Sequence, residues 1–334
     1  MIKVAVIGAG YWGPNLIRNF YGINRECVRF VCDQDSSVIG RLKNSFPGVE
    51  FVSDYSLVLN SPEVDGVVVA TQPTSHFALS KEALEKGKHV FVEKPLALNT
   101  SEAEELVALS RSKNRVLMVG HLLRYHPAVK LLKDYLERGE LGDVLYIYST
   151  RVNLGKVRQD ENALWSFAPH DLAVIIYLMG RKPVSVSAVG QSYLTPDVED
   201  VVFLTVFFEG NCMAHVHVSW LDPHKIRKLT VVGNKKMAVF DDMEASEMIR
   251  IFDKGVDYSP GFKSYAEAVS LRVGDILIPR VQMKEPLRIE CEHFIECVEK
   301  GKHPLTDGEE GVAVVRVLEG AQKSMRLSGS LVQL

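Results

Sequence analysis

A glycine-rich turn between a strand and a helix is the feature that most constrains how this chain folds. The motif Gly8-Ala9-Gly10-Tyr11-Trp12-Gly13 follows the apolar run 2–7 and precedes a helical pattern that begins at Pro14. The first glycine makes the tight turn, the second lets the backbone approach a pyrophosphate, and the third lets the helix pack against the strand. Unpaired N–H groups at the helix N-terminus attract phosphate. The motif therefore predicts dinucleotide binding by the whole turn.

An acidic residue follows at the distance that such a turn requires. Asp33 ends the next predicted strand, twenty residues after Gly13. A carboxylate at this place can accept hydrogen bonds from both ribose hydroxyls of an adenosine. Asp35 follows without an arginine beside it, and two carboxylates repel a 2′-phosphate. The sequence therefore favours NAD over NADP as the cofactor.

The order of predicted elements indicates two domains. Continuous apolar strands at 2–7, 28–32, 66–70, 89–92 and 116–119 alternate with helices, which is typical of a parallel sheet covered on both faces. After Gly120 longer strands follow one another at 145–153, 183–191, 200–208, 212–220 and 227–233. Helices are expected at 127–138, 170–179, 287–300 and 308–327, and residues 253–285 are expected to form loops with short elements. We predict an α/β Rossmann domain, a doubly wound parallel sheet, over 1–121. Residues 122–334 are expected to form an α+β domain with a large open mixed or antiparallel sheet.

Composition narrows the class of protein. A chain of 334 residues tends to form two domains, and the balance of 39 Lys+Arg against 42 Asp+Glu argues against a nucleic-acid partner. No apolar stretch approaches the roughly 18 residues of a membrane span, so no membrane partner is expected. The five cysteines show no CxxC spacing, which indicates a reducing, cytoplasmic compartment. His215 and His217 share one strand face without an evident third ligand, so no metal site is predicted.

Polar residues at the carboxyl ends of two predicted parallel strands are candidates for chemistry. Thr71-Gln72-Pro73 follows one strand and Glu93-Lys94-Pro95 follows another, at the edge where open α/β sheets bind ligands. Lys94 can donate a hydrogen bond to a substrate hydroxyl or transfer its proton, and the alternative is a solvated surface lysine. His170 precedes an apolar helix, where it can act in catalysis, cap the helix or belong to the core.

Taken together, these motifs resemble the glucose–fructose oxidoreductase and inositol dehydrogenase (Gfo/Idh/MocA) superfamily over essentially the whole chain. The resemblance implies an NAD-dependent dehydrogenase that oxidises a sugar-ring secondary hydroxyl and forms homodimers or homotetramers through the C-terminal sheet. It implies that Lys94 contacts the reacting hydroxyl and the nicotinamide ribose, and that His170 is the general acid/base. The residues implied to line the cofactor are Thr71, Gln72, Pro73, His76, Glu93 and Lys94.

A finer resemblance concerns the substrate. The opening 8–16 and the segment 151–171 are similar to bacterial sugar-nucleotide 3-dehydrogenases that act on UDP-N-acetylglucosaminuronic acid. The substrate-binding residues that this implies are Arg124, Asn153, Arg158, Trp165 and Asp171. A diphosphate and a carboxylate need cations, which Arg124, Arg151, Lys156 and Arg158 can supply. The alternative for these cations is surface salt bridging.

One departure leaves the proton acceptor open. Many members of the superfamily place an aspartate four residues before the histidine, and here that place is Ser166. The acceptor is then Lys94 or His170. Three other functions remain open: an inositol or free-sugar dehydrogenase, a non-catalytic NAD-binding regulator, and a hydrolase that retains its NAD.

Overall fold

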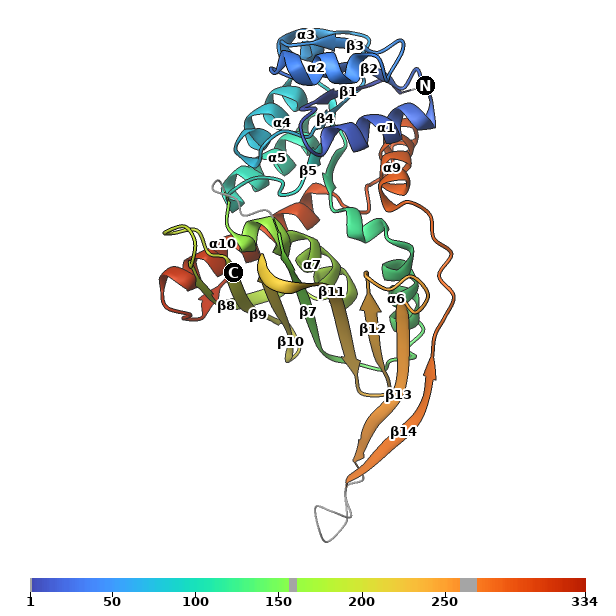
Figure 1. Cartoon of the computed structure of the whole chain (residues 1–334), viewed down its shortest axis with the longest axis vertical. Coiled ribbons are helices and arrows are strands. Elements are labelled where there is room, and N and C mark those ends of the chain that lie inside the picture. The colour runs from blue at the N-terminus through green and yellow to red at the C-terminus, as the bar shows by residue number, and fades with distance from the viewer. Residues whose placement is uncertain (1, 156–160, 259–268) are drawn as a thin grey trace. The chain divides into compact units, whose positions relative to one another are not determined.

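The protein forms two compact units in a computed structural model that describes residues 2–155, 161–258 and 269–334 (Figure 1). The first unit contains residues 1–125 together with 284–319, and the second contains 126–283 together with 320–334. Residues 284–319, which the sequence analysis assigns to the C-terminal domain, thus belong to the first unit. Each unit is described separately below.

The first unit is built on a parallel sheet. Among the described residues it has six strands in the order β3-β2-β1-β4-β5-β6. The strands are β1 (Val4–Ile7), β2 (Val28–Cys32), β3 (Glu50–Val52), β4 (Gly66–Val69), β5 (His89–Glu93) and β6 (Leu117–Gly120). The helices are α1 (Gly13–Ile23), α2 (Ser36–Lys43), α3 (Tyr55–Asn60), α4 (His76–Glu85), α5 (Thr100–Ser112) and α9 (Pro286–Lys300). The predicted Rossmann fold is confirmed, and the strand order reverses between β1 and β4, where such sheets bind ligands.

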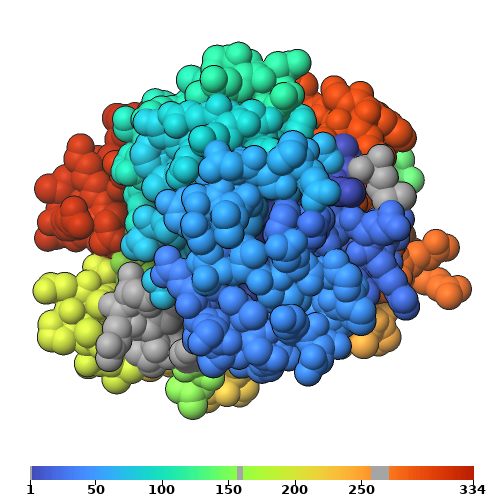
Figure 2. Space-filling model, turned by 90° about the horizontal axis from the view of Figure 1, so that it is seen from above, coloured from blue at the N-terminus to red at the C-terminus, as the bar shows by residue number. Residues whose placement is uncertain are grey.

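An aromatic cluster explains why α9 belongs to this unit. Phe294 of α9 is fully buried and packs edge-on against Phe20 of α1 and Phe91 of β5, with ring centroids 6.2 Å and 5.8 Å away. Phe20 and Phe91 also meet edge-on, which is a favourable geometry for aromatic rings. The absent side chain of Gly66 leaves room for the Phe294 ring. Figure 2 shows the outer surface of the unit, where the blue and cyan N-terminal segments lie side by side.

The second unit is built on a mixed sheet. Its described strands run in the order β14-β13-β12-β11-β7-β10-β9-β8-β15, with β7 and β10 parallel and the other neighbours antiparallel. The strands are β7 (Val144–Leu154), β8 (Pro183–Gln191), β9 (Val201–Phe208), β10 (Cys212–Ser219), β11 (Leu221–Gly233), β12 (Met237–Asp241), β13 (Ile249–Tyr258), β14 (Val269–Leu277) and β15 (Val332–Gln333). The helices α6 (Pro127–Glu137) and α7 (Ala163–Met179) pack on this sheet, and α10 (Gly308–Arg326) contributes residues to both units. The predicted open mixed sheet is confirmed.

Two expected elements differ from the structure. Residues 253–285 were expected to be loops, but β13 and β14 form an antiparallel pair there at the edge of the sheet. A register shift between Phe252 and Lys254 interrupts the alternation of apolar residues, so the sequence pattern alone does not show these strands.

Helix α7 begins at Ala163 rather than at the expected His170. Asn162 caps it by accepting a hydrogen bond from the Trp165 N–H, and the Asn162 amide also donates to Glu199 and Gln322. Pro169 lies inside the helix, where it costs about 3 kcal/mol. The cap and the buried helix positions on both sides of Pro169 offset that cost.

No helix in the part of the chain that the structure describes is both long enough and apolar enough to cross a membrane.

Candidate functional site

The glycine turn has the shape that a pyrophosphate requires. Gly8 has φ +93°, and a Cβ there would lie 2.7 Å from the Ala70 carbonyl group. A Cβ at Gly13 would lie 2.2 Å from the Gly8 carbonyl oxygen, so α1 can approach β1 only because residue 13 has no side chain. At Gly10 a Cβ would meet no described atom within 4 Å, so this part of the turn faces open space. The residues present therefore fit a dinucleotide.

Asp33 is fixed beside the turn. Its Oδ2 accepts a hydrogen bond from the Ala9 N–H at 2.7 Å, and its Oδ1 accepts from the Asp35 N–H at 2.9 Å. Each carboxylate oxygen keeps a second lone pair that can accept from a ribose hydroxyl. Asp35 caps α2, and its hydrogen bonds with Ser37 lower the pKa of its carboxyl. Two negative charges thus stand at the place where the 2′-oxygen of an adenosine is expected. In the turn itself, the Tyr11 side chain is 92% exposed.

A hydrogen bond joins the turn to the end of β5. The Trp12 Nε1–H donates to Glu93 Oε1 at 2.7 Å. The Glu93 carboxyl lies against Gly120 of the neighbouring strand, where a Cβ would be only 2.9 Å from Oε2. Burial raises the pKa of Glu93 to about 7, although Lys94 and Trp12 act in the opposite direction. Lys94, the next residue, therefore lies at the carboxyl edge of the sheet beside the turn.

His76 connects the segments that follow β4 and β5. Its ring is 1% exposed, with Nδ1 2.7 Å from the Pro95 carbonyl oxygen and Nε2 3.1 Å from the Thr71 carbonyl oxygen. Burial lowers the pKa of His76, and a neutral ring donates to one of these carbonyls at a time. The structure thus brings Thr71 and the Lys94–Pro95 segment together through His76. Gln72 precedes the short 3-10 helix η1 (Pro73–Ser75) in the same connection.

The candidates in the second unit surround a buried ion pair. The Arg151 guanidinium on β7 pairs with the Asp171 carboxylate on α7, and their side chains are only 9% and 5% exposed. His170 precedes Asp171 on the same helix, Trp165 lies on its first turn, and Asn153 lies on β7. Because Arg151 and Asp171 neutralise each other, Asp171 contributes no free charge there.

Of the other cations predicted to bind substrate, one belongs to the first unit and two lie outside the described residues. Arg124 belongs to the first unit, where its Nε donates to both oxygens of Glu310 at 3.0 and 2.9 Å. Its side chain is 6% exposed, and it also donates to the Leu305 carbonyl. Glu310 is far away in the sequence, so no local pattern indicates this pair. Lys156 and Arg158 lie outside the described residues, and the substrate contacts of all these cations stay predictions.

Two buried polar residues near this edge of the sheet were not predicted as site residues from the sequence. His121 directly follows β6 and is 1% exposed, and Glu290 of α9 is fully buried. Neither side chain has a hydrogen-bond partner among the described residues. His121 was accessible to the rule that identified Lys94, since both residues follow predicted parallel strands. Glu290 carries no such signal, because its surroundings depend on how α9 packs.

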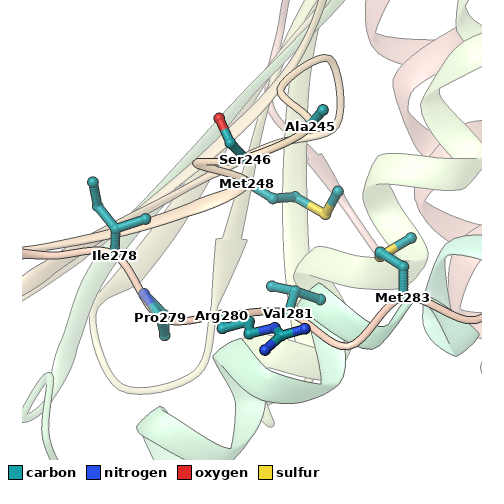
Figure 3. A pocket seen from close by; sticks show the side chains of 8 residues that line it. All are labelled: Ala245, Ser246, Met248, Ile278, Pro279, Arg280, Val281 and Met283. Atoms are coloured by element: carbon teal, nitrogen blue, oxygen red, sulfur yellow. The ribbon is translucent and has the colours of Figure 1, made fainter.

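A separate cavity of about 330 Å³ lies in the second unit. Figure 3 shows its lining residues, which include Ala245, Ser246 and Met248 from one segment and Ile278, Val281 and Met283 from another. None of the predicted site residues lines this cavity, so it is distinct from the site described above. No group of three metal-ligating side chains occurs in the described ranges.

Comparison with known proteins shows similarity along both units. Residues 2–121 match a family described as an oxidoreductase family with an NAD-binding Rossmann fold, and residues 129–239 match the GFO/IDH/MocA C-terminal domain. UDP-N-acetylglucosamine 3-dehydrogenase of Acidithiobacillus ferrooxidans is 26% identical over 96% of this chain and 95% of that protein. The NAD-dependent scyllo-inositol 2-dehydrogenase of Bacillus subtilis is 25% identical over 100% of this chain and 96% of that protein.

Solved structures show the same fold. A crystal structure of GenD2 from gentamicin A biosynthesis in complex with NAD matches with a TM-score of 0.82 and 22% identity, covering 100% of this chain and 96% of that one. The Acidithiobacillus ferrooxidans 3-dehydrogenase structure matches with a TM-score of 0.80 and 24% identity, covering 97% and 99% of the two chains.

Proposed function

Because this chain belongs to the Gfo/Idh/MocA oxidoreductase family and carries its NAD-binding Rossmann domain, we propose that it is an NAD-dependent dehydrogenase that oxidises a secondary hydroxyl of a sugar ring. The observation that carries the proposal is the link between the glycine turn and the end of β5. Through the 2.7 Å hydrogen bond from Trp12 to Glu93, the turn that would hold the cofactor is tied to the residue before Lys94. The lysine is thereby held at the edge of the sheet where this fold binds ligands.

Each candidate residue has a separate task in this reaction. When bound, NAD supplies the hydride acceptor at the nicotinamide. Lys94, as the neutral amine, holds the reacting hydroxyl and takes its proton, and His170 is the second candidate acid/base. Asp171, the neighbour of His170, is paired with Arg151, and Ser166 replaces the aspartate common in the family. The proton acceptor is therefore Lys94 or His170, and we propose Lys94.

The turn favours NAD over NADP. Asp33 and Asp35 stand together at the end of β2, and the Asp33 carboxylate is held by the Ala9 N–H. A 2′-phosphate would meet both negative charges. A comparison of the two cofactors by calorimetry is expected to show tighter binding of NAD, and the Asp33→Asn variant should reduce this preference.

For the substrate we propose oxidation at C3 of a UDP-linked N-acetylhexosamine, with the uronate as the first member to test. Support comes from the 3-dehydrogenase relative, which is named for UDP-N-acetylglucosamine. The choice of a uronate is supported only by the cations that the sequence predicts at the site. Two of these cations, Arg124 and Arg151, have acidic partners within their own units. Inositol is the alternative, because a relative named for scyllo-inositol matches over the whole chain.

The absorbance of NADH distinguishes these substrates. Purified protein with NAD is mixed separately with the UDP-uronate, UDP-N-acetylglucosamine, inositol and free glucose. Reduction with a UDP-sugar supports the proposal, and reduction with inositol alone supports the alternative. Absence of reduction with every compound, despite NAD binding, favours a regulator, and NAD retained through dialysis favours a hydrolase.

Replacement of Lys94 tests the chemistry itself. Lys94→Ala should leave NAD affinity nearly unchanged while turnover falls by about 10²–10⁴-fold, the range for loss of a general acid or base. Lys113→Ala is the matched control, because Lys113 is an exposed residue at the end of α5. Turnover of the Lys94 variant equal to that of the control would remove the lysine from the mechanism.

We also propose that the uncovered face of the second sheet joins copies of this chain into a homodimer or homotetramer. Tyr148, Phe203 and Met213 are 42%, 40% and 43% exposed on this face, and Phe203 stacks on His217 with centroids 4.3 Å apart. Aromatic patches of this kind on a sheet are typical of interfaces. Phe203→Lys should lower the mass in sedimentation, whereas Tyr193→Lys, at a loop position that is 69% exposed, should not.

A further inference from the structure

Glu290 is the most unusual buried group in the first unit. It lies on α9, has no exposed surface, and neither of its carboxyl oxygens has a hydrogen-bond partner among the described residues. Burying an ionised carboxylate without a partner is very costly, and the group normally takes up a proton instead. The Glu290 carboxyl is therefore expected to be protonated in the folded protein.

The packing of α9 places Glu290 toward Glu93. Phe294 follows Glu290 by one helical turn and contacts Phe91, which precedes Glu93 by two residues on the same face of β5. Cys297, further along α9, lines a cavity together with His89 at the beginning of β5. Helix and strand therefore run in opposite directions, and Glu290 lies beside the carboxyl end of the strand. The two carboxyl groups repel each other electrostatically.

The groups around Glu93 and Glu290 can compensate only one negative charge. Glu93 of β5 interacts electrostatically with Lys94, and Glu290 interacts electrostatically with Glu93, with Tyr125 of the 3-10 helix η2 (Leu122–Tyr125) and with Cys291 of α9. Burial and Glu290 raise the pKa values of Tyr125 and Cys291, so both stay neutral. Arg288, also on α9, acts electrostatically on Cys291 and is paired with Glu292.

We propose that Glu93 and Glu290 form an acid pair that holds one proton at neutral pH, so that the pair carries a single negative charge beside Lys94. The inference deepens the proposed function, on which the role of Lys94 rests. Glu290 is then a positioning residue that acts through Glu93. With Glu290 neutral, the Glu93 carboxylate is free to hold Trp12 of the glycine turn at 2.7 Å and to stabilise the ammonium that Lys94 becomes when it accepts the hydroxyl proton.

Loss of the proton that the two carboxyls hold has a defined consequence. Burial raises the pKa of Glu93 to about 7 and that of Glu290 well above its ordinary value. Since the unfolded chain releases these protons near pH 4.5, the folded state binds more protons above that pH. The contribution of these two carboxyls to stability must therefore fall as the pH rises toward their folded-state pKa values.

Chemical denaturation over pH 5–9 tests this consequence without any substrate. In Glu290→Gln an amide that cannot ionise replaces the carboxyl. The stability of this variant relative to the wild type should therefore improve with rising pH, and the ratio of the two unfolding constants should change by up to about tenfold per pH unit. Glu299→Gln is the matched control, because Glu299 is exposed on the same helix and should follow the wild-type profile. Parallel profiles for wild type and Glu290→Gln would overturn the proposal.

Infrared spectroscopy detects the proton directly. The wild type at pH 7 should show the carbonyl band of a protonated carboxylic acid, and this band should be weaker in Glu290→Gln. Glu310 is a second source of such a band, because burial raises its pKa to about 7. In Glu310→Gln this second source is absent, so any protonated-acid band that remains comes from the pair. The variant therefore tests whether the pair holds a proton even if Glu290→Gln does not fold. Absence of the band in Glu310→Gln would refute the pair.

Calorimetry then separates positioning from mere packing. In the wild type, NAD affinity should weaken as the pH rises and the pair loses its proton, whereas in Glu290→Gln the affinity should change less. A packing residue would alter affinity equally at every pH. The protein could show no dehydrogenase activity and still show the infrared band and this pH dependence. That result would support the acid pair and contradict only the proposed reaction.

Discussion

A single methyl group added at Gly10 or at Gly13 should separate the fold of the glycine turn from its function. At Gly13 the new Cβ would lie 2.2 Å from the Gly8 carbonyl oxygen, whereas real Cβ atoms essentially never come within 3.0 Å. Helix α1 would have to move by at least about 0.8 Å, the difference between these two distances. Leu16, Ile17 and Phe20 resist that movement because they are fully buried.

The two substitutions differ in the quantity that they change. Overpacking of this kind costs about 1–3 kcal/mol, so Gly13→Ala should lower the Tm by several degrees, at roughly 2–4 °C per kcal/mol. At Gly10 a Cβ meets no described atom within 4 Å, so Gly10→Ala should leave the Tm unchanged. There the methyl group would stand where a pyrophosphate approaches. Loss of one hydrogen bond to a charged group, worth about 1.5–3 kcal/mol, weakens NAD binding roughly 10–100-fold.

Thermal unfolding and NAD calorimetry on the same preparations measure both effects. Gly40→Ala is the control, because Gly40 lies in α2 with no described atom near its Cβ position. It should raise stability by up to about 1 kcal/mol and leave NAD affinity unchanged. Unaltered NAD affinity in Gly10→Ala would refute the assignment of this turn to the pyrophosphate.

Three further substitutions test the packing and charge of each unit. Phe294→Ala should destabilise the first unit by about 3–5 kcal/mol in urea, since the ring is fully buried between α1 and β5. A loss below 1 kcal/mol would contradict the assignment of α9 to that core. His121 is neutral in the folded protein because burial lowers its pKa to about 3 from the ordinary 6.5. The contribution of His121 to stability should therefore fall by up to about 1.4 kcal/mol per pH unit as the pH drops below 6.5, so the stability of His121→Phe relative to the wild type should improve by that amount per pH unit. Asp171→Asn leaves the buried Arg151 without its counter-charge, and we expect a loss of about 3–5 kcal/mol, with the Arg151→Met/Asp171→Leu double variant more stable than the single one.

The first sheet could be predicted because its signals are local. Each parallel strand is a short apolar run followed by a helix, and the turn from Gly8 to Gly13 has a fixed pattern of glycines. The observed strands β1, β2, β4, β5 and β6 lie within the predicted runs or differ from them by a residue at an end. Lys94 was predicted as a site residue in the same way, because carboxyl ends of parallel strands share one edge.

The start of α7 and the pair of β13 and β14 were not predictable locally. Pro169 indicates a helix end to any local rule, yet the cap at Asn162 depends on Glu199 and Gln322, which are distant in the sequence. The edge strands depend on β12, which supplies the partner that their irregular pattern needs. In both cases contacts from remote residues outweigh the local preference.

By itself, the sequence determined the class of fold, the cofactor turn and the family, since all three depend on residues close together in the chain. Only the tertiary structure decided the partners of the charged groups. It paired Arg124 with Glu310 and Arg151 with Asp171, and it left Glu290 buried without a hydrogen-bond partner among the described residues. The physical reason is that the energy of a buried charge depends on the atoms around it in space, which the order of residues along the chain does not specify.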